Sequence, residues 1–86
     1  MLQKVDDAVS VDWLYDHTLR RPVIKTICWN GRTYSITRFG LHHTYRTGQT
    51  LYHVFSIESL TLFFRLVFNT DNLHWTLEEI ADGQPT

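Results

Sequence analysis

Histidines are the residues in this chain whose type most directly suggests chemistry. His42 and His43 are adjacent, and His53 is the nearest third imidazole along the sequence. Metal sites built from histidine use separated ligands at fixed spacing, and the chain has neither a Cys pair nor a His-x-x-x-His motif. We therefore expect no metal and no cofactor, and these three residues are the only candidates for metal binding. His53 is expected to be a buried, hydrogen-bonded and neutral histidine on an otherwise apolar face.

The other reactive side chains are poorly arranged for catalysis. Cys28 is the only cysteine and is surrounded by threonine and serine, so it is expected to be a small packing residue. Glu78 and Glu79 are adjacent on a predicted strand, and their carboxylates therefore point to opposite faces. No phosphate-binding loop or nucleophile elbow is present. The sequence predicts a protein that is not an enzyme.

A sharper pattern surrounds the dipeptide Asn30-Gly31, which is a strong signal for a two-residue β-hairpin. Folding the chain at this turn places aromatic, aliphatic and basic side chains on one face of the hairpin. The predicted pairs are Trp29 with Arg32, Ile27 with Tyr34, Lys25 with Ile36, and Val23 with Arg38.

An aromatic and basic face of this kind is suited to stacking on bases while its cations contact phosphates. The sequence thus predicts a small binding module for nucleic acid or another polyanion. The candidate ligand-binding residues are Lys25, Trp29, Arg32, Arg38, Tyr45 and Arg46.

Two alternatives to this face remain open. The same aromatic residues fit a hydrophobic core, with the cations extending outward at its edge. In the second alternative, the chain is a protein-interaction or homodimerisation module that uses an open strand edge or an exposed strip. The strip consists of Tyr52, Val54, Phe63 and Arg65.

Charge is unevenly distributed along the chain, although the formal net charge is only −1. Residues 17–65 are basic, whereas residues 1–16 and 66–86 are acidic. A basic centre of this kind is typical of a protein with an anionic partner. Alternatively, the acidic ends fold back and neutralise it.

The elements that must position these residues begin with a predicted helix over about 8–20. Asp7 can cap its N-terminus, Pro22 ends it, and apolar residues recur with helical spacing. The residues at positions i, i+3, i+4 and i+7 are Val11, Leu14, Tyr15 and Thr18.

Strands are predicted from about residue 23 to residue 80. A turn at Glu58-Ser59 pairs Phe55 with Leu62, and a second turn over 69–72 pairs Leu66 with Trp75. Both turns place the same apolar residues on one face. The predicted fold is mainly β (α+β), with five antiparallel strands in a meander that forms a curled sheet or small barrel beside the helix. The tail, residues 82–86, is expected to fray.

Length and composition fit a single domain over residues 1–86, with 43% hydrophobic residues. One cysteine and a charged N-terminal sequence give no indication of secretion, and no apolar run is long enough to cross a membrane. We expect a cytoplasmic protein without a membrane partner.

The sequence also resembles uncharacterised small bacterial domains. The resemblance rests on the W-x-G-R-x-Y run that begins at Trp29, the F-R-L strand at Phe64, and the W-x-L-E-E strand at Trp75. It covers about residues 23–80 and implies a β fold. It implies no activity and assigns no functional residue.

Overall fold

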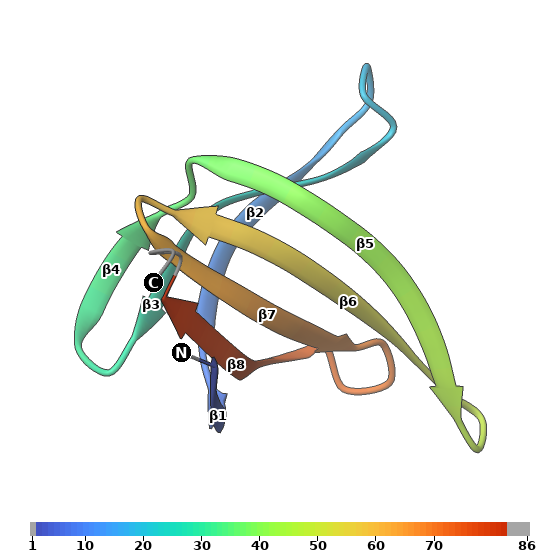
Figure 1. Ribbon diagram of the computed structural model, residues 1–86. Coiled ribbons are helices and arrows are strands. Elements are labelled where there is room, and N and C mark those ends of the chain that lie inside the picture. The colour runs from blue at the N-terminus through green and yellow to red at the C-terminus, as the bar shows by residue number, and fades with distance from the viewer. Residues whose placement is uncertain (1, 83–86) are drawn as a thin grey trace.

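The computed structural model describes residues 2–82, and these residues form an all-β fold of eight strands (Figure 1). The strands are β1 (Leu2–Ala8), β2 (Ser10–Asp16), β3 (Arg21–Trp29), β4 (Arg32–Ser35), β5 (Arg38–Thr47), β6 (Thr50–Ser59), β7 (Leu62–Asn69) and β8 (His74–Asp82).

All strand pairs are antiparallel and belong to two sheets. The larger sheet has the order β1-β8-β7-β6-β5, and the smaller one has the order β2-β3-β4. The end of the β2–β3 hairpin projects beyond β5, away from the rest of the molecule (Figure 1). The two sheets do not close into a barrel. The predicted antiparallel β architecture is therefore confirmed, whereas the single five-stranded meander and the small barrel are wrong, because eight strands form two separate sheets.

The chain passes between the sheets at two corners, and backbone hydrogen bonds hold each corner. At the first corner, the Val9 N–H donates to the Trp75 carbonyl of β8 at 3.2 Å. At the second, the Ile36 N–H donates to Lys25 of β3 at 2.9 Å, and the Thr37 N–H donates to Glu58 of β6 at 2.8 Å. Because neighbouring residues bond to different sheets, the corners fix how the smaller sheet sits on the larger one.

The core lies between the two sheets. Ile24 and Ile27 of β3 pack against the inner face of β6, β7 and β8, and Ile27 is fully buried. Burial of this apolar face supplies the main driving force for folding, at about 25 cal/mol per Å². The inner-face residues of the larger sheet in this cluster are Phe55, Ile57, Phe64, Leu66, Trp75 and Leu77.

The Asn30-Gly31 hairpin is confirmed at its turn, where the two residues have φ of 55° and 75°. Trp29 pairs with Arg32 and Ile27 with Tyr34, as predicted. The pairing ends at Thr26 and Ser35, because the chain turns at the second corner and enters the other sheet.

The predicted pair of Val23 with Arg38 is wrong, because Arg38 pairs with Glu58 of β6. Lys25 and Ile36 lie just beyond the last paired residues of the hairpin, and the Ile36 N–H still donates to the Lys25 carbonyl at 2.9 Å. On the β2 side, Lys25 is the extra, unpaired residue of a bulge, where Asp12 pairs with Thr26 and Trp13 with Ile24. This bulge shifts the alternation of side chains along β3, so that Ile24 and Ile27 both face inward while Lys25 is exposed.

The predicted helix over 8–20 is wrong, because these residues contain β2 and the turn that follows it. Val9, Val11, Trp13 and Tyr15 alternate with polar or exposed residues, and this period-two pattern competes with the helical spacing. All four are favoured in strands. Pairing with β3 then decides in favour of the strand.

The two later hairpins have the predicted apolar face but different turns. Phe55 pairs with Leu66 rather than Leu62, and Leu66 pairs with Leu77 rather than Trp75. Each register differs from the predicted one by an even number of residues, so the same side chains still face the core. The turns lie two and one residues further along the chain, and each contains a leucine with positive φ: Leu60 at 56° and Leu73 at 64°.

Two remaining expectations concern the chain ends and the membrane. Asp82 is the last residue of β8, and residues 83–86 of the expected frayed tail lie outside the described residues. Among residues 2–82, no helix has the length and apolar character needed to cross a bilayer.

The core predicts a clear difference between two leucine truncations. Leu66→Ala removes a fully buried side chain and is expected to lower the free energy of unfolding by about 2–5 kcal/mol. The control Leu60→Ala changes a side chain that is 83% exposed and is expected to cost no more than about 0.5 kcal/mol. Urea unfolding of both variants measures the difference, and equal losses would contradict this account of the core.

Candidate binding cleft

An aromatic cleft of about 200 Å³ lies where the smaller sheet stops covering the inner face of the larger one. The β2–β3 hairpin forms one wall, and β6, β7 and β8 form the other. The cleft is almost entirely apolar, so it favours a flat or apolar group over a small polar one. Its lining residues are Trp13, Tyr15, Pro22, His53, Phe55, Phe68 and Trp75.

Trp13 is the residue of the hairpin that closes the cleft against the larger sheet. Its ring meets Phe68 at 5.9 Å and Trp75 at 5.8 Å between centroids, and both contacts are edge-to-face. Trp75 is 8% exposed, whereas Trp13 remains 39% exposed. One ring therefore belongs to the core, and the other offers free surface beside it.

A pair of histidines lies at the β5–β6 side of the cleft. His42 Nε2 and His53 Nδ1 are 2.8 Å apart, so one nitrogen donates a hydrogen bond and the other accepts it. The His42 ring also stacks on Phe55, with centroids 4.4 Å apart and planes inclined by 5°. The hydrogen bond expected for His53 is confirmed, whereas its expected burial is wrong, because the residue is only half-buried.

The environment of His42 lowers its pKa below the usual 6.5. Desolvation by burial is the largest cause, followed by the charges of His53 and His43. Each of these effects disfavours the protonated ring. The geometry thus favours the neutral form of His42.

The three candidate metal ligands do not form a metal centre in the structure. His43 pairs with Val54 and His42 with Phe55, which places the two imidazoles on opposite faces of β5. Among residues 2–82, no group of three or more His, Cys, Asp or Glu side chains could hold a metal ion.

Three of the six predicted ligand-binding residues lie around β3 and the turn to β4. Trp29 packs against the core, and its indole N–H donates to the Asp7 carboxylate at 3.0 Å. Lys25 and Arg32 are exposed, the former at the β3 bulge and the latter beside the turn. The N–H edge of the Trp29 ring is therefore occupied by a hydrogen bond to Asp7 and is not free for a ligand.

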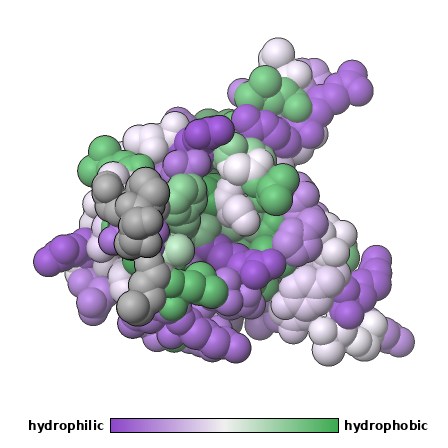
Figure 2. All heavy atoms as spheres, in the orientation of Figure 1, coloured by the Kyte–Doolittle hydropathy of each residue, from purple (hydrophilic) through white to green (hydrophobic). Residues whose placement is uncertain are grey.

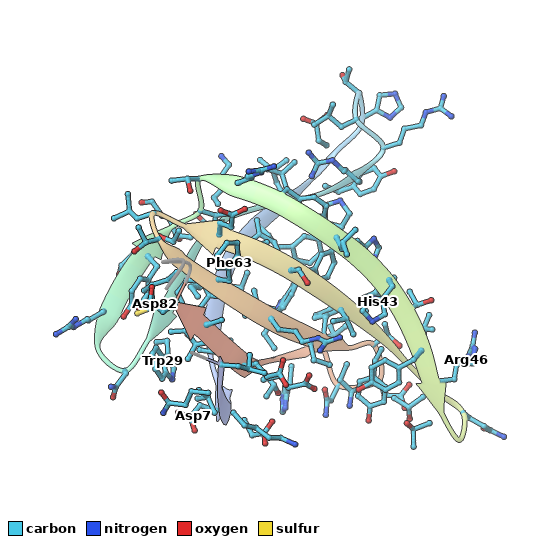
Figure 3. All side chains as sticks on the ribbon, in the orientation of Figure 1. Asp7, Trp29, His43, Arg46, Phe63 and Asp82 are labelled. Carbon is cyan, nitrogen blue, oxygen red and sulfur yellow. The ribbon has the colours of Figure 1, made fainter. Side chains whose placement is uncertain are left out.

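The other three candidates lie on β5. Arg38 forms an ion pair with Glu58 at 3.6 Å. Tyr45 stacks on Tyr52 on the outer face of the larger sheet, with centroids 4.9 Å apart. Arg46 is at the far end of β5, and Figure 3 shows it on the opposite side of the molecule from Trp29. The six candidates therefore do not share one surface.

Burial is the largest cause that raises the pKa of Tyr45 above 10.0, with the charge of Glu78 and then Tyr52 adding to it and Arg65 opposing it. The Tyr45 phenol is accordingly neutral at physiological pH.

Most cations of the basic centre have no carboxylate partner. Within residues 2–82, ion pairs engage only three cations, namely Lys4, Arg38 and Arg65. Only Arg65 is paired with the acidic C-terminal strand, through Glu78 and Glu79. Folding back of the acidic ends thus neutralises little of the centre. The described cations without an ion pair are Arg20, Arg21, Lys25, Arg32 and Arg46.

Asp7 and Asp82 lie on one side of the molecule, and Arg46 lies on the other (Figure 3). Arg20 and Arg21 belong to the projecting hairpin, whose end carries apolar and polar side chains together (Figure 2). Arg21 also lies over the Phe39 ring of β5 at 4.3 Å. The cleft therefore opens between two elements that carry unpaired cations.

A larger hollow, of about 330 Å³, lies on the outer face of the larger sheet. Its cation, Arg65, is held by Glu78 at 3.6 Å and by Glu79 at 3.4 Å, so its charge is already compensated. Phe63 at the rim is 42% exposed, whereas Val54 of the same predicted strip is buried. The strip is narrower than the sequence suggested, and this hollow is the weaker candidate for an anionic ligand.

Sequence reasoning placed none of the cleft residues other than His53 among its candidates. The sequence predicts a helix for Trp13 and Tyr15 and a place in the core for Phe68 and Trp75. The alternation of Val9, Val11, Trp13 and Tyr15 was the signal that could have revealed a strand with aromatic side chains on one face. The packing of that face against β7 and β8 brings together residues that are distant in sequence, so no local sequence pattern indicates it.

No protein-family model, curated protein or solved structure matches this chain. The resemblance to small bacterial domains with a W-x-G-R-x-Y hairpin stays a prediction.

The histidine pair predicts a titration at lower pH than usual. In the folded protein, the His42 ring protons should titrate with a midpoint below 6.5 in an NMR titration. Because the unfolded chain takes up this proton first as pH falls, the His42 contribution to stability is present above pH 6.5. It is lost as pH falls from there through the lowered folded pKa.

Two matched variants identify the cause. His53→Gln is expected to raise the His42 midpoint more than His43→Gln does, since the charge of His53 has the larger effect. A His42 midpoint at or above 6.5 in the unsubstituted protein would show that the pair does not form as described.

Proposed function

We propose that this protein is a non-enzymatic binding module for single-stranded nucleic acid, with a base in the aromatic cleft and phosphates on the surrounding cations. A protein of this class combines aromatic side chains on which bases stack with a positively charged path for the backbone. Non-enzymatic action and a cytoplasmic location, both expected from the sequence, belong to the same proposal.

The observation that carries the proposal is the exposed Trp13 ring beside an apolar cleft whose neighbouring elements bear unpaired cations. A cleft of about 200 Å³ has room for one planar ring between Trp13 and the aromatic side chains of the larger sheet. Arg20 lies on the hairpin side and Arg46 on the β5 side. Neither has an ion pair among the described residues, so a phosphate would not have to displace a carboxylate.

The position of the proposed site differs from that of the aromatic and basic face predicted from the sequence. Trp29 and Tyr34 of that face pack against the core, which supports the interpretation of them as structural residues. Asp7 also accepts the Trp29 N–H and places negative charge beside that ring. The function predicted from the sequence is kept, and its centre moves to Trp13 and Arg46.

Fluorescence anisotropy with labelled single-stranded DNA and RNA tests this function. Affinity should fall as the salt concentration rises. When Lys and Arg side chains bind the phosphates, they displace salt counterions, and this release is less favourable at high salt. Trp13→Ala removes a stacking ring worth about 1–3 kcal/mol per base and should weaken binding by about 5-fold to 150-fold. Arg46→Gln should weaken binding at low salt and reduce the salt dependence.

Arg32→Gln is the matched control, since it removes the same charge from an exposed arginine at the β3–β4 turn. It should leave the affinity close to that of the unsubstituted protein. A loss with Arg32→Gln and none with Arg46→Gln would return the site to the hairpin face. No binding to any oligonucleotide at low salt would reject nucleic acid as the ligand.

A further inference from the structure

The outer edge of β5 is open and regular. β5 is the last strand of the larger sheet and pairs only with β6 among the described residues. From His42 to Thr47 it pairs residue for residue with β6, and all residues from Gly40 to Gln49 are exposed. A strand edge of this length offers a row of unpaired backbone groups to another strand.

The other three sheet edges carry features that prevent such pairing. β1 has a bulge at Asp6, with φ of 53°, and three of its seven residues are charged. β2 carries two aspartates and faces the bulge of β3. β4 has only four residues. Charges, bulges and short strands are the usual means by which proteins protect sheet edges.

β5 lacks these features where it is regular. Its irregularity lies at Gly40 and Leu41, before the regular segment begins, and its Arg38 charge is paired with Glu58. Arg46 is the one formal charge between His42 and Thr47. The contrast with the opposite edge of the same sheet indicates that β5 is kept free for a partner strand.

The turn that follows β5 determines which backbone groups point outward. Gly48 and Gln49 form a two-residue turn, so Thr47 and Thr50 are a pair that bond to each other. Bonded and non-bonded pairs alternate along antiparallel strands. The N–H and C=O groups of His42, Thr44 and Arg46 therefore point away from β6.

We propose that β5 pairs antiparallel with β5 of a second copy of this chain, with the two-fold axis at Thr44. This register places Thr44 opposite its own copy and Arg46 opposite His42 of the second copy. It uses all three outward-pointing residues of each strand and joins the larger sheets of the two copies into one.

Self-pairing at this register agrees with the side chains. No two formal charges face each other, because Arg46 meets an uncharged imidazole rather than another arginine. On the outer face, Tyr45 meets His43 of the second copy and extends its stack on Tyr52. Leu41, which is 72% exposed in the single chain, gains Thr47 of the second copy as a neighbour. A copy of the same strand is therefore a suitable partner.

Light scattering coupled to size-exclusion chromatography tests the proposal. The mass of the unsubstituted protein should rise from 10.2 kDa toward twice that value with increasing concentration. Thr44→Pro removes an N–H that makes no bond to β6, so circular dichroism should show a retained fold while the protein becomes monomeric.

Charge variants at the same position test the register. Thr44→Lys and Thr44→Glu each place like charges opposite each other and should be monomeric, whereas their equimolar mixture should restore the dimer. Thr18→Lys, at the end of the hairpin, is the matched control and should dimerise like the unsubstituted protein.

Three results would overturn the proposal. One is a monomeric unsubstituted protein at every concentration. Another is persistence of the dimer in both charge variants, which would place the interface elsewhere. The last is failure of the mixture to dimerise when each charge variant is folded and monomeric, which would exclude pairing centred on Thr44.

Discussion

The rest of the structure depends on how far a three-stranded sheet can cover the inner face of a five-stranded one. Ile24 and Ile27 of β3 cover Phe55, Phe64 and their neighbours, and this contact forms the core. Beyond it, only the hairpin passes over the larger sheet. The hairpin does not bury all the aromatic side chains there, so a cleft remains. Core and cleft are thus two parts of one incompletely covered face, and Trp75 belongs to both.

Bulges decide which side chains reach that face, and they explain most of what the sequence could not predict. One extra residue reverses the alternation of a strand, as Lys25 does in β3 and Glu78 does in β8. Lys25 consequently lies at the surface, although strict alternation places it beside Ile27. Bulges depend on pairing and packing between segments that are distant in sequence. No local sequence pattern around Lys25 predicts the bulge.

Two kinds of feature could be predicted from the sequence: turns that their own residues specify, and strand faces that stay the same when the predicted turn is misplaced. Asn30-Gly31 specifies its turn directly, because both residues adopt positive φ at little cost. The apolar face of β6 and β7 was correct despite a misplaced turn, because an even shift in register preserves the face. Leu60 occupies a turn position that propensity rules assign to glycine or asparagine, so the turn itself was missed. Trp13 was misassigned because residues 9–15 satisfy both helical and strand periodicity, and only pairing with β3 separates the two.

The two proposals share β5, and their geometry makes them compatible. In β5, the side chains of His42 and Arg46 face the inner side of the sheet, whereas their backbone groups face its free edge. A ligand in the cleft and a second copy at the edge would therefore use different atoms of the same residues. A two-fold axis perpendicular to the joined sheet would leave both clefts open on one side. A single strand of nucleic acid that reached both would bind more tightly than either site alone, because the second contact would be intramolecular. Dimerisation would then increase affinity without any change within the cleft.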